Sequence, residues 1–100
     1  MNNGDKIYWT TEALNNLNYI LKFLEENWSA KEKSNFIQKL DKRIKLIAHY
    51  PELFPKSEKS KIVRRSVLTE HRTIFYLIKQ NIIEVLSLFD VRQDSNKIKI

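Results

Sequence analysis

Cysteine is absent from this sequence, which excludes disulfide bridges, thiolate zinc sites and catalysis by a cysteine nucleophile. Histidine is scarce as well, because His49 and His71 are the only two, so we expect no metal site. No stretch approaches the roughly 18 apolar residues of a membrane span, and the first residues lack the apolar core of a secretory signal. We therefore expect a soluble cytoplasmic protein that needs neither a cofactor nor a membrane.

Glycine and proline are also rare, with one and two residues respectively in a chain of 100. Hydrophobic residues make up 42% and charged residues 30%, a composition typical of globular proteins rather than disordered or fibrous ones. Two smaller domains would each bury too little apolar surface to offset their conformational entropy. We predict a single domain over residues 1–100.

Acidic residues are outnumbered, since 12 of them face 18 lysines and arginines and the formal charge is +6. Such a domain attracts polyanions through a field that weakens as salt increases. Nucleic acid, a ribosome or an acidic protein partner would all fit this charge. Net charge also keeps small domains soluble, so the charge alone does not select a function.

Apolar residues spaced three and four apart predict two consecutive helices after a short strand at residues 6–9. Thr10 or Thr11 can cap the first helix, whose apolar stripe consists of Ala13, Leu14, Leu17, Ile20, Leu21, Leu24 and Trp28. Ser29 and Glu32 match a capping box that starts the second helix, with apolar positions Phe36, Ile37, Leu40, Ile44 and Ile47. Charged residues of the second helix, Arg43 among them, are expected on its solvated side.

Pro51 ends the second helix near Tyr50, and the short link between the helices predicts an antiparallel helical hairpin. After a connecting segment at 51–61, residues 62–68, 73–79 and 82–89 are rich in β-branched and aromatic residues and predict a three-strand meander. The middle strand is apolar on both faces, so it requires cover on both sides.

The predicted fold is therefore α+β: an N-terminal strand and an antiparallel helical hairpin, packed on one face of a small antiparallel sheet that the C-terminal meander completes. The face without helices is the natural place for a functional surface or a partner helix. We expect Tyr8, Trp9, Trp28, Phe36 and Phe75 in the core, and Tyr76 to pack rather than to face solvent.

Basic residues gather on and beside the predicted sheet, namely Lys56, Lys59, Lys61, Arg64, Arg65, Arg72 and Arg92. Guanidinium groups suit phosphate because their forked donors match its oxygens and their charge persists when partly buried. The connecting-segment lysines have an alternative role, since basic residues discourage sheets from pairing edge to edge. Arg72 and Arg92 also have one, a structural ion pair with Asp90 or Glu70.

The sequence offers no nucleophile with its base, no glycine-rich phosphate loop and no paired carboxylate site. Any catalysis would therefore use arginine, lysine or tyrosine. Such cations can promote RNA cleavage by stabilising the negative charge of the transition state while a base frees the 2′-hydroxyl.

The order of these elements, together with five segments, resembles the RelE/ParE toxin superfamily. The segments are Trp9-Thr10-Thr11-Glu12-Ala13, Tyr50-Pro51-Glu52-Leu53-Phe54-Pro55, Val63-Arg64-Arg65, His71-Arg72-Thr73-Ile74-Phe75-Tyr76 and Leu88-Phe89-Asp90-Val91-Arg92-Gln93. They extend through nearly the whole chain. The resemblance implies the toxin of a type II toxin–antitoxin system, a class that includes plasmid stabilisation proteins.

Ribonuclease members of this superfamily cut messenger RNA on the ribosome with an arginine on the third strand and another after the fourth. Arg72 and Arg92 match these two arginines, so the resemblance assigns them as catalytic, without a metal. Lys61, Arg64, Arg65 and Lys97 are the expected RNA-binding or phosphate-binding residues, with Lys97 in place of a family tyrosine that has no counterpart here. On this basis we predict a ribosome-dependent endoribonuclease that inhibits translation, with the ribosome and messenger RNA as partners.

Two other functions fit the same resemblance. The gyrase-inhibiting members share the long helical hairpin and lack the full ribonuclease set, and a homologue that binds antitoxin without being toxic is the third alternative. Membership in any of these groups implies a heteromeric complex with a cognate antitoxin, whose helix or strand covers the basic face. The exposed apolar positions of the sheet make such a partner physically reasonable.

Overall fold

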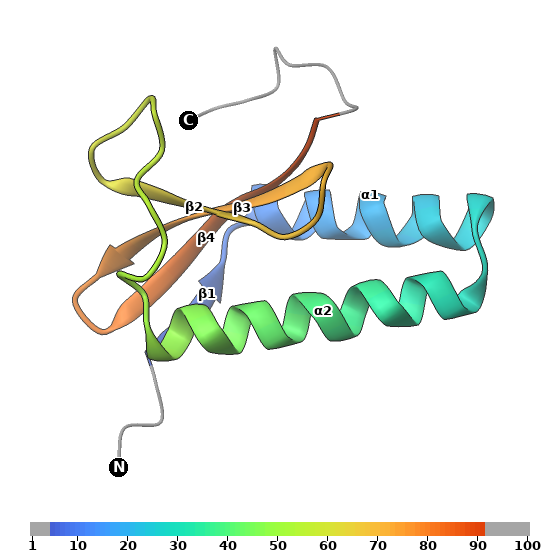
Figure 1. Ribbon diagram of the computed structural model, residues 1–100, viewed down its shortest axis with the longest axis horizontal. Helices are drawn as coiled ribbons and strands as arrows, with labels where there is room; N and C mark the ends of the chain where they lie inside the picture. The colour runs from blue at the N-terminus through green and yellow to red at the C-terminus, as the bar shows by residue number, and fades with distance from the viewer. Residues whose placement is uncertain (1–4, 92–100) are drawn as a thin grey trace.

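The computed structural model describes residues 5–91, which form a helical hairpin and a four-stranded sheet (Figure 1). Its elements are β1 (Lys6–Trp9), α1 (Thr11–Asn27), α2 (Ala30–His49), β2 (Val63–Val67), β3 (Arg72–Lys79) and β4 (Ile82–Asp90). This order confirms the predicted strand, helical hairpin and three-strand meander.

The helix boundaries follow from side chains that satisfy free backbone groups. The Thr10 hydroxyl accepts a hydrogen bond from the Ala13 amide at 3.1 Å, and the Ser29 hydroxyl accepts one from the Glu32 amide at 3.2 Å. At the other end, α2 stops at His49 because Pro51 restricts the backbone of Tyr50. Both helices therefore begin and end where local sequence signals place them.

The strand order is β1-β4-β3-β2, and the sheet is mixed rather than wholly antiparallel. The three C-terminal strands pair antiparallel as predicted, but β1 pairs with β4 in parallel, with Lys6 opposite Ile82 and Trp9 opposite Val85. The reason is topological: the helical hairpin returns the chain to the start of β1, where the Asp5 amide donates to the Ala48 carbonyl at 2.9 Å. Two hairpin turns then make β4 run in the same direction as β2, and β4 pairs in parallel with β1.

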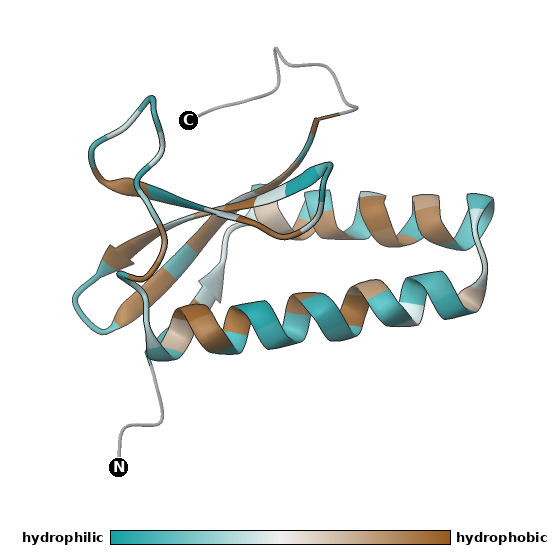
Figure 2. Cartoon of the chain, viewed as in Figure 1, coloured by the Kyte–Doolittle hydropathy of each residue, from teal (hydrophilic) through white to brown (hydrophobic). Residues whose placement is uncertain are grey.

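Both helices lie on one face of the sheet (Figure 1), and the core fills the space between the two layers. Its buried residues come from both helices, from β3 and β4, and from Leu68 just after β2; they include Ala13, Ile20, Leu24, Phe36, Leu40, Ile47, Ile74, Tyr76, Ile83, Val85 and Leu88. Along both helices apolar and polar residues alternate with the helical period (Figure 2), as an amphipathic layer requires. Tyr76 is fully buried, which confirms its predicted packing role.

Two aromatic residues expected in the core lie at the surface instead. Tyr8 is 56% exposed and Trp28 is 57% exposed. Tyr8 sits on the outermost strand, and Trp28 lies at the link between the helices. Phe75 is half-buried but lies outside the core, on the face of the sheet without helices. The core prediction was wrong for these three residues because the sequence pattern does not show which positions the opposite layer covers.

A β-bulge in β4 is held by two side chains from the start of α1. The register of β3 with β4 shifts between Phe75 and Tyr76, which leaves backbone groups near Leu86 outside the regular ladder. The Thr10 hydroxyl donates to the Leu86 carbonyl at 3.0 Å, and the side-chain Oδ1 of Asn16 accepts from the Leu88 amide at 3.0 Å. These bonds join α1 to β4 and fix their relative position.

The segment that connects α2 to β2, residues 50–62 (the connector), folds back along the outer edge of β2. The Arg65 amide donates to the Pro55 carbonyl at 2.9 Å, and the Ser57 amide donates to the Val63 carbonyl. Side chains from the sheet hold the same segment, since the Tyr76 hydroxyl donates to the Pro51 carbonyl at 2.6 Å. The connector thus occupies hydrogen-bonding positions that an edge strand would otherwise expose.

Candidate functional site

Arg72, the expected catalytic arginine of the third strand, lies on the helix side of the sheet and is paired with Asp90. Its Nε atom is 3.2 Å from the Asp90 carboxylate, and the two side chains are only 11% and 7% exposed. The guanidinium also lies over the Phe36 ring, 5.3 Å from the ring centroid. This is the structural ion pair that the sequence offered as the alternative role of Arg72.

A groove opens beside Arg72 between the distal part of the helical hairpin and the β2–β3 turn. Two adjoining cavities of about 270 and 190 Å³ share Leu24, Glu32, Thr69 and Arg72 as lining residues. The larger one is also lined by Trp28, Glu70 and His71. Two carboxylates, of Glu32 and Glu70, line this groove together with Arg72 and Lys39, so the opposite charges balance and do not select phosphate.

Arg64 and Arg65, expected to bind RNA together, project to opposite faces of the sheet because side chains alternate along a strand. Arg64 lies opposite Tyr76, on the helix side, and donates to the Phe54 carbonyl at 2.7 Å. Its guanidinium is therefore engaged in holding the connector.

Arg65 lies opposite Phe75, on the face of the sheet that the helices leave uncovered. Within residues 5–91, no hydrogen-bond partner meets its buried Nε atom. Phe75, Leu77 and Phe89 are half-buried, and by alternation with buried neighbours they share this face. We call Arg65, Phe75, Leu77 and Phe89 the open face; it combines apolar area with one guanidinium.

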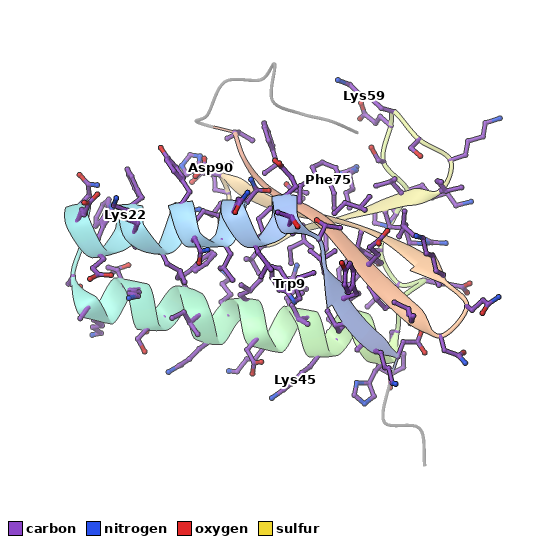
Figure 3. The ribbon with its side chains drawn as sticks, turned by 180° about the vertical axis from the view of Figure 1, so that it is seen from behind. Trp9, Lys22, Lys45, Lys59, Phe75 and Asp90 are labelled. Atoms are coloured by element: carbon purple, nitrogen blue, oxygen red, sulfur yellow. The ribbon has the colours of Figure 1, made fainter. Side chains whose placement is uncertain are left out.

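Lysines of the connector that were expected at the site do not join Arg72. Lys61 is exposed on the connector, as are Lys56 and Lys59, and Figure 3 shows Lys59 at the outer loop of this segment. Arg92 and Lys97 lie outside the described residues. Among residues 5–91 the structure thus separates the predicted cations into a buried ion pair, a connector anchor, an open-face arginine and exposed lysines.

Arg43 has a role that sequence reasoning missed. It was expected on the solvated side of α2, but its Nη1 atom donates to the Ser66 hydroxyl at 2.8 Å and to the Val67 carbonyl at 2.7 Å. Its guanidinium also lies over the Phe54 ring at 5.5 Å. Arg43 therefore fastens α2 to the end of β2, and only the tertiary packing reveals this contact.

Among the described residues, Tyr76 has a pKa that its surroundings shift upward. Burial raises the pKa of its phenol to about 12, and the positive charge of Arg64 opposes this shift. The hydroxyl is therefore protonated at neutral pH and serves as a donor to the connector. This places Tyr76 in the scaffold rather than in acid–base chemistry.

The described residues contain no cluster of three or more His, Cys, Asp or Glu side chains that could hold a metal ion. In the same part of the chain, no helix has the length and apolarity that crossing a membrane would require.

Comparison with protein families gives a match over residues 7–95 to the model described as the ParE toxin of the type II toxin–antitoxin system parDE. No curated protein matches the sequence. The family match covers all of the helices and strands of the structure except Lys6, the first residue of β1.

Solved structures show the same fold at low sequence identity. A chain of the chromosomal ParDE system from P. aeruginosa superposes with a TM-score of 0.75 at 15% identity, covering 90% of this chain and 99% of that chain. A chain of the E. coli DinJ-YafQ toxin–antitoxin complex gives 0.62 at 8% identity, with 87% and 92% covered. The YoeB dimer from Staphylococcus aureus gives 0.59 at 17% identity, with 84% and 93% covered.

Proposed function

Because the chain belongs to the ParE toxin family of type II toxin–antitoxin systems, we propose that it inhibits growth by binding DNA gyrase. The alternative activity in the superfamily is ribosome-dependent cleavage of messenger RNA, which the sequence favoured through Arg72 and Arg92. The two activities belong to different classes, one an inhibitory binding event and the other a catalysed reaction.

The environment of Arg72 is the observation that supports binding over catalysis. A catalytic arginine must place its guanidinium against the phosphate that is being cleaved. Here the guanidinium is 11% exposed, lies next to the Asp90 carboxylate and rests on Phe36. Contact with RNA would require this buried contact between Arg72 and Asp90 to open, and breaking a buried ion pair is costly.

We further propose that a cognate antitoxin covers the open face. Phe75, Leu77 and Phe89 supply apolar area beside the guanidinium of Arg65, a combination that suits an amphipathic segment carrying a carboxylate. Two of the similar structures, the ParDE system and the DinJ-YafQ complex, are themselves toxin–antitoxin assemblies. Their assembly supports a heteromeric complex for this chain.

The proposed target can be tested by adding the purified chain to two reactions in parallel. One is DNA supercoiling by gyrase, and the other is cell-free translation of a reporter message. We expect supercoiling to stop while the message stays intact. Cleaved message with normal supercoiling would support the endoribonuclease instead, and no effect on either reaction or on growth would support the non-toxic homologue.

The antitoxin face can be tested by co-purification with the product of the adjacent open reading frame. Phe75→Asp should abolish the complex because it places a charge in the apolar part of the open face. Ile37→Asp is the matched control, since Ile37 is an exposed apolar residue on α2. Equal loss of the complex in both variants, or retention in both, would contradict the assignment.

A further inference from the structure

The outer side of α2 carries a polar stripe that the open face proposed for the antitoxin does not include. Lys31, Gln38, Lys42, Lys45 and His49 are separated by seven, four, three and four positions, which places them on one side of the helix. All five are exposed, and the buried residues of the helix lie on its opposite side. We call these five residues the α2 stripe; Figure 3 shows Lys45 extending away from α1.

Positive charge is concentrated on α2 rather than spread evenly over the helical layer. This helix has six lysines and arginines against two acidic residues, whereas α1 has one against three. The α2 stripe itself contains no carboxylate. A helix face that only maintains solubility usually mixes both signs, so this asymmetry favours an anionic partner.

Ion pairs do not neutralise the lysines of the α2 stripe. Lys45 contacts Asp41 at 3.0 Å, but both side chains are largely exposed, and such pairs contribute little and exchange readily. The other helical pair, between Lys33 and Glu25 at 3.0 Å, lies off the stripe. Lys31 and Lys42 are in no ion pair within residues 5–91. These ammonium groups are therefore available to phosphate.

We propose that the α2 stripe binds the phosphate backbone of duplex DNA. Lysine, glutamine and histidine are donors that commonly contact phosphate oxygens without reading sequence. The stripe extends for about 27 Å, at ~1.5 Å per residue, so lysines toward its two ends can reach phosphates on both sides of a major groove about 12 Å wide. The open face lies on the side of the sheet away from the helices, so antitoxin and DNA would bind opposite surfaces of the molecule.

The choice of duplex DNA over RNA rests on the proposed function, because gyrase holds duplex DNA where an inhibitor of gyrase would meet it. The backbone contact itself rests on the charge and spacing of the α2 stripe. The two inferences therefore need separate tests.

Titration of a fluorescent duplex of about 20 base pairs with the full chain, between about 50 and 200 mM salt, tests the inference. The variant Lys31→Gln/Lys42→Gln/Lys45→Gln should bind more weakly. Each lost phosphate contact reduces the slope of log K against log salt by about 0.9, so the slope should become less negative by about 2 to 3. Circular dichroism of the variant checks that the fold is retained.

A second triple variant, Lys6→Gln/Lys22→Gln/Lys59→Gln, makes the same change in net charge at exposed lysines away from α2. It should leave the salt slope nearly unchanged. Equal loss in both triple variants would reduce the effect to net charge and overturn the proposal. Tighter binding to an RNA duplex of the same length would overturn the choice of DNA.

The titration contains no gyrase, so its result is independent of the supercoiling assay. A chain that does not inhibit gyrase but binds DNA through α2 would refute the proposed function alone. A chain that inhibits gyrase with an unchanged salt slope in the α2 variant would refute this inference alone.

Discussion

Replacing Arg72 tests whether this residue belongs to the scaffold or to the chemistry. The substitution Arg72→Met keeps a flexible side chain on the Phe36 ring but removes the guanidinium that lies 3.2 Å from the Asp90 carboxylate, which is 7% exposed. Removing one partner of a buried ion pair typically costs about 3 to 5 kcal/mol. For a domain of this size, that loss lowers the melting temperature by roughly 15 to 30 °C.

The double variant Arg72→Met/Asp90→Leu should recover most of this loss. Replacing both charges of a buried pair with apolar side chains is often neutral or stabilising, because the desolvation cost of the ions disappears. Urea unfolding of the parent, both single variants and the double variant gives the coupling energy of the pair. Additive effects of the two substitutions, or a cost below about 0.5 kcal/mol for Arg72→Met, would refute the structural role.

The folded double variant also separates the two activities. Under the gyrase proposal Arg72 does not touch the target, so expression of Arg72→Met/Asp90→Leu should still inhibit growth. If the double variant is folded and binds antitoxin but is harmless, Arg72 acts directly on the target, and the ribonuclease assignment regains its main support.

Three further predictions concern the scaffold. The folded-state pKa of Tyr76, about 12, lies above the unfolded value of 10.0, so its contribution is complete below pH 10 and is lost as pH rises toward 12. Tyr76→Phe should lack this alkaline loss of about 2 to 3 kcal/mol, and an identical profile in parent and variant would exclude the phenol as its source. Gln80 has a φ of 46°, a backbone conformation that is strained for a residue with a Cβ atom and relaxed for glycine. Gln80→Gly should therefore raise the unfolding free energy by about 0.5 to 1 kcal/mol in a urea titration. Asn16→Ala should cost about 1 to 3 kcal/mol in the same assay, because the Leu88 amide loses its acceptor, while exposed Asn18→Ala should change little.

The sequence predicted the elements because their signals are local. The caps at Thr10 and Ser29, the helical periodicity and the stop before Pro51 each depend on a few neighbouring residues. The parallel pairing of β1 with β4 was not predicted, because strand order depends on packing between distant segments. The bulge near Leu86 was missed for the same reason.

The candidate site was harder to predict than the fold. The position of Arg72 at the start of an apolar strand indicated a place near the core, and the ion pair with Asp90 was among the expected roles. Arg64 and Arg65 look equivalent in the sequence, yet the alternation of the strand sends them to opposite faces. Arg43 carries no sequence signal for its contact with β2, since both Ser66 and Val67 are more than twenty residues away.

The connector along β2 has a consequence for how the molecule behaves in isolation. Backbone hydrogen bonds with Pro55 and Ser57, and the guanidinium of Arg43, occupy the edge of β2. Few backbone groups are therefore left at this edge for a strand of another chain to pair with. The other edge of the sheet is β1, a strand of only four residues. Without a bound antitoxin, the chain therefore exposes little free strand edge on which fibrous stacking could begin, which would leave it able to diffuse to its proposed target.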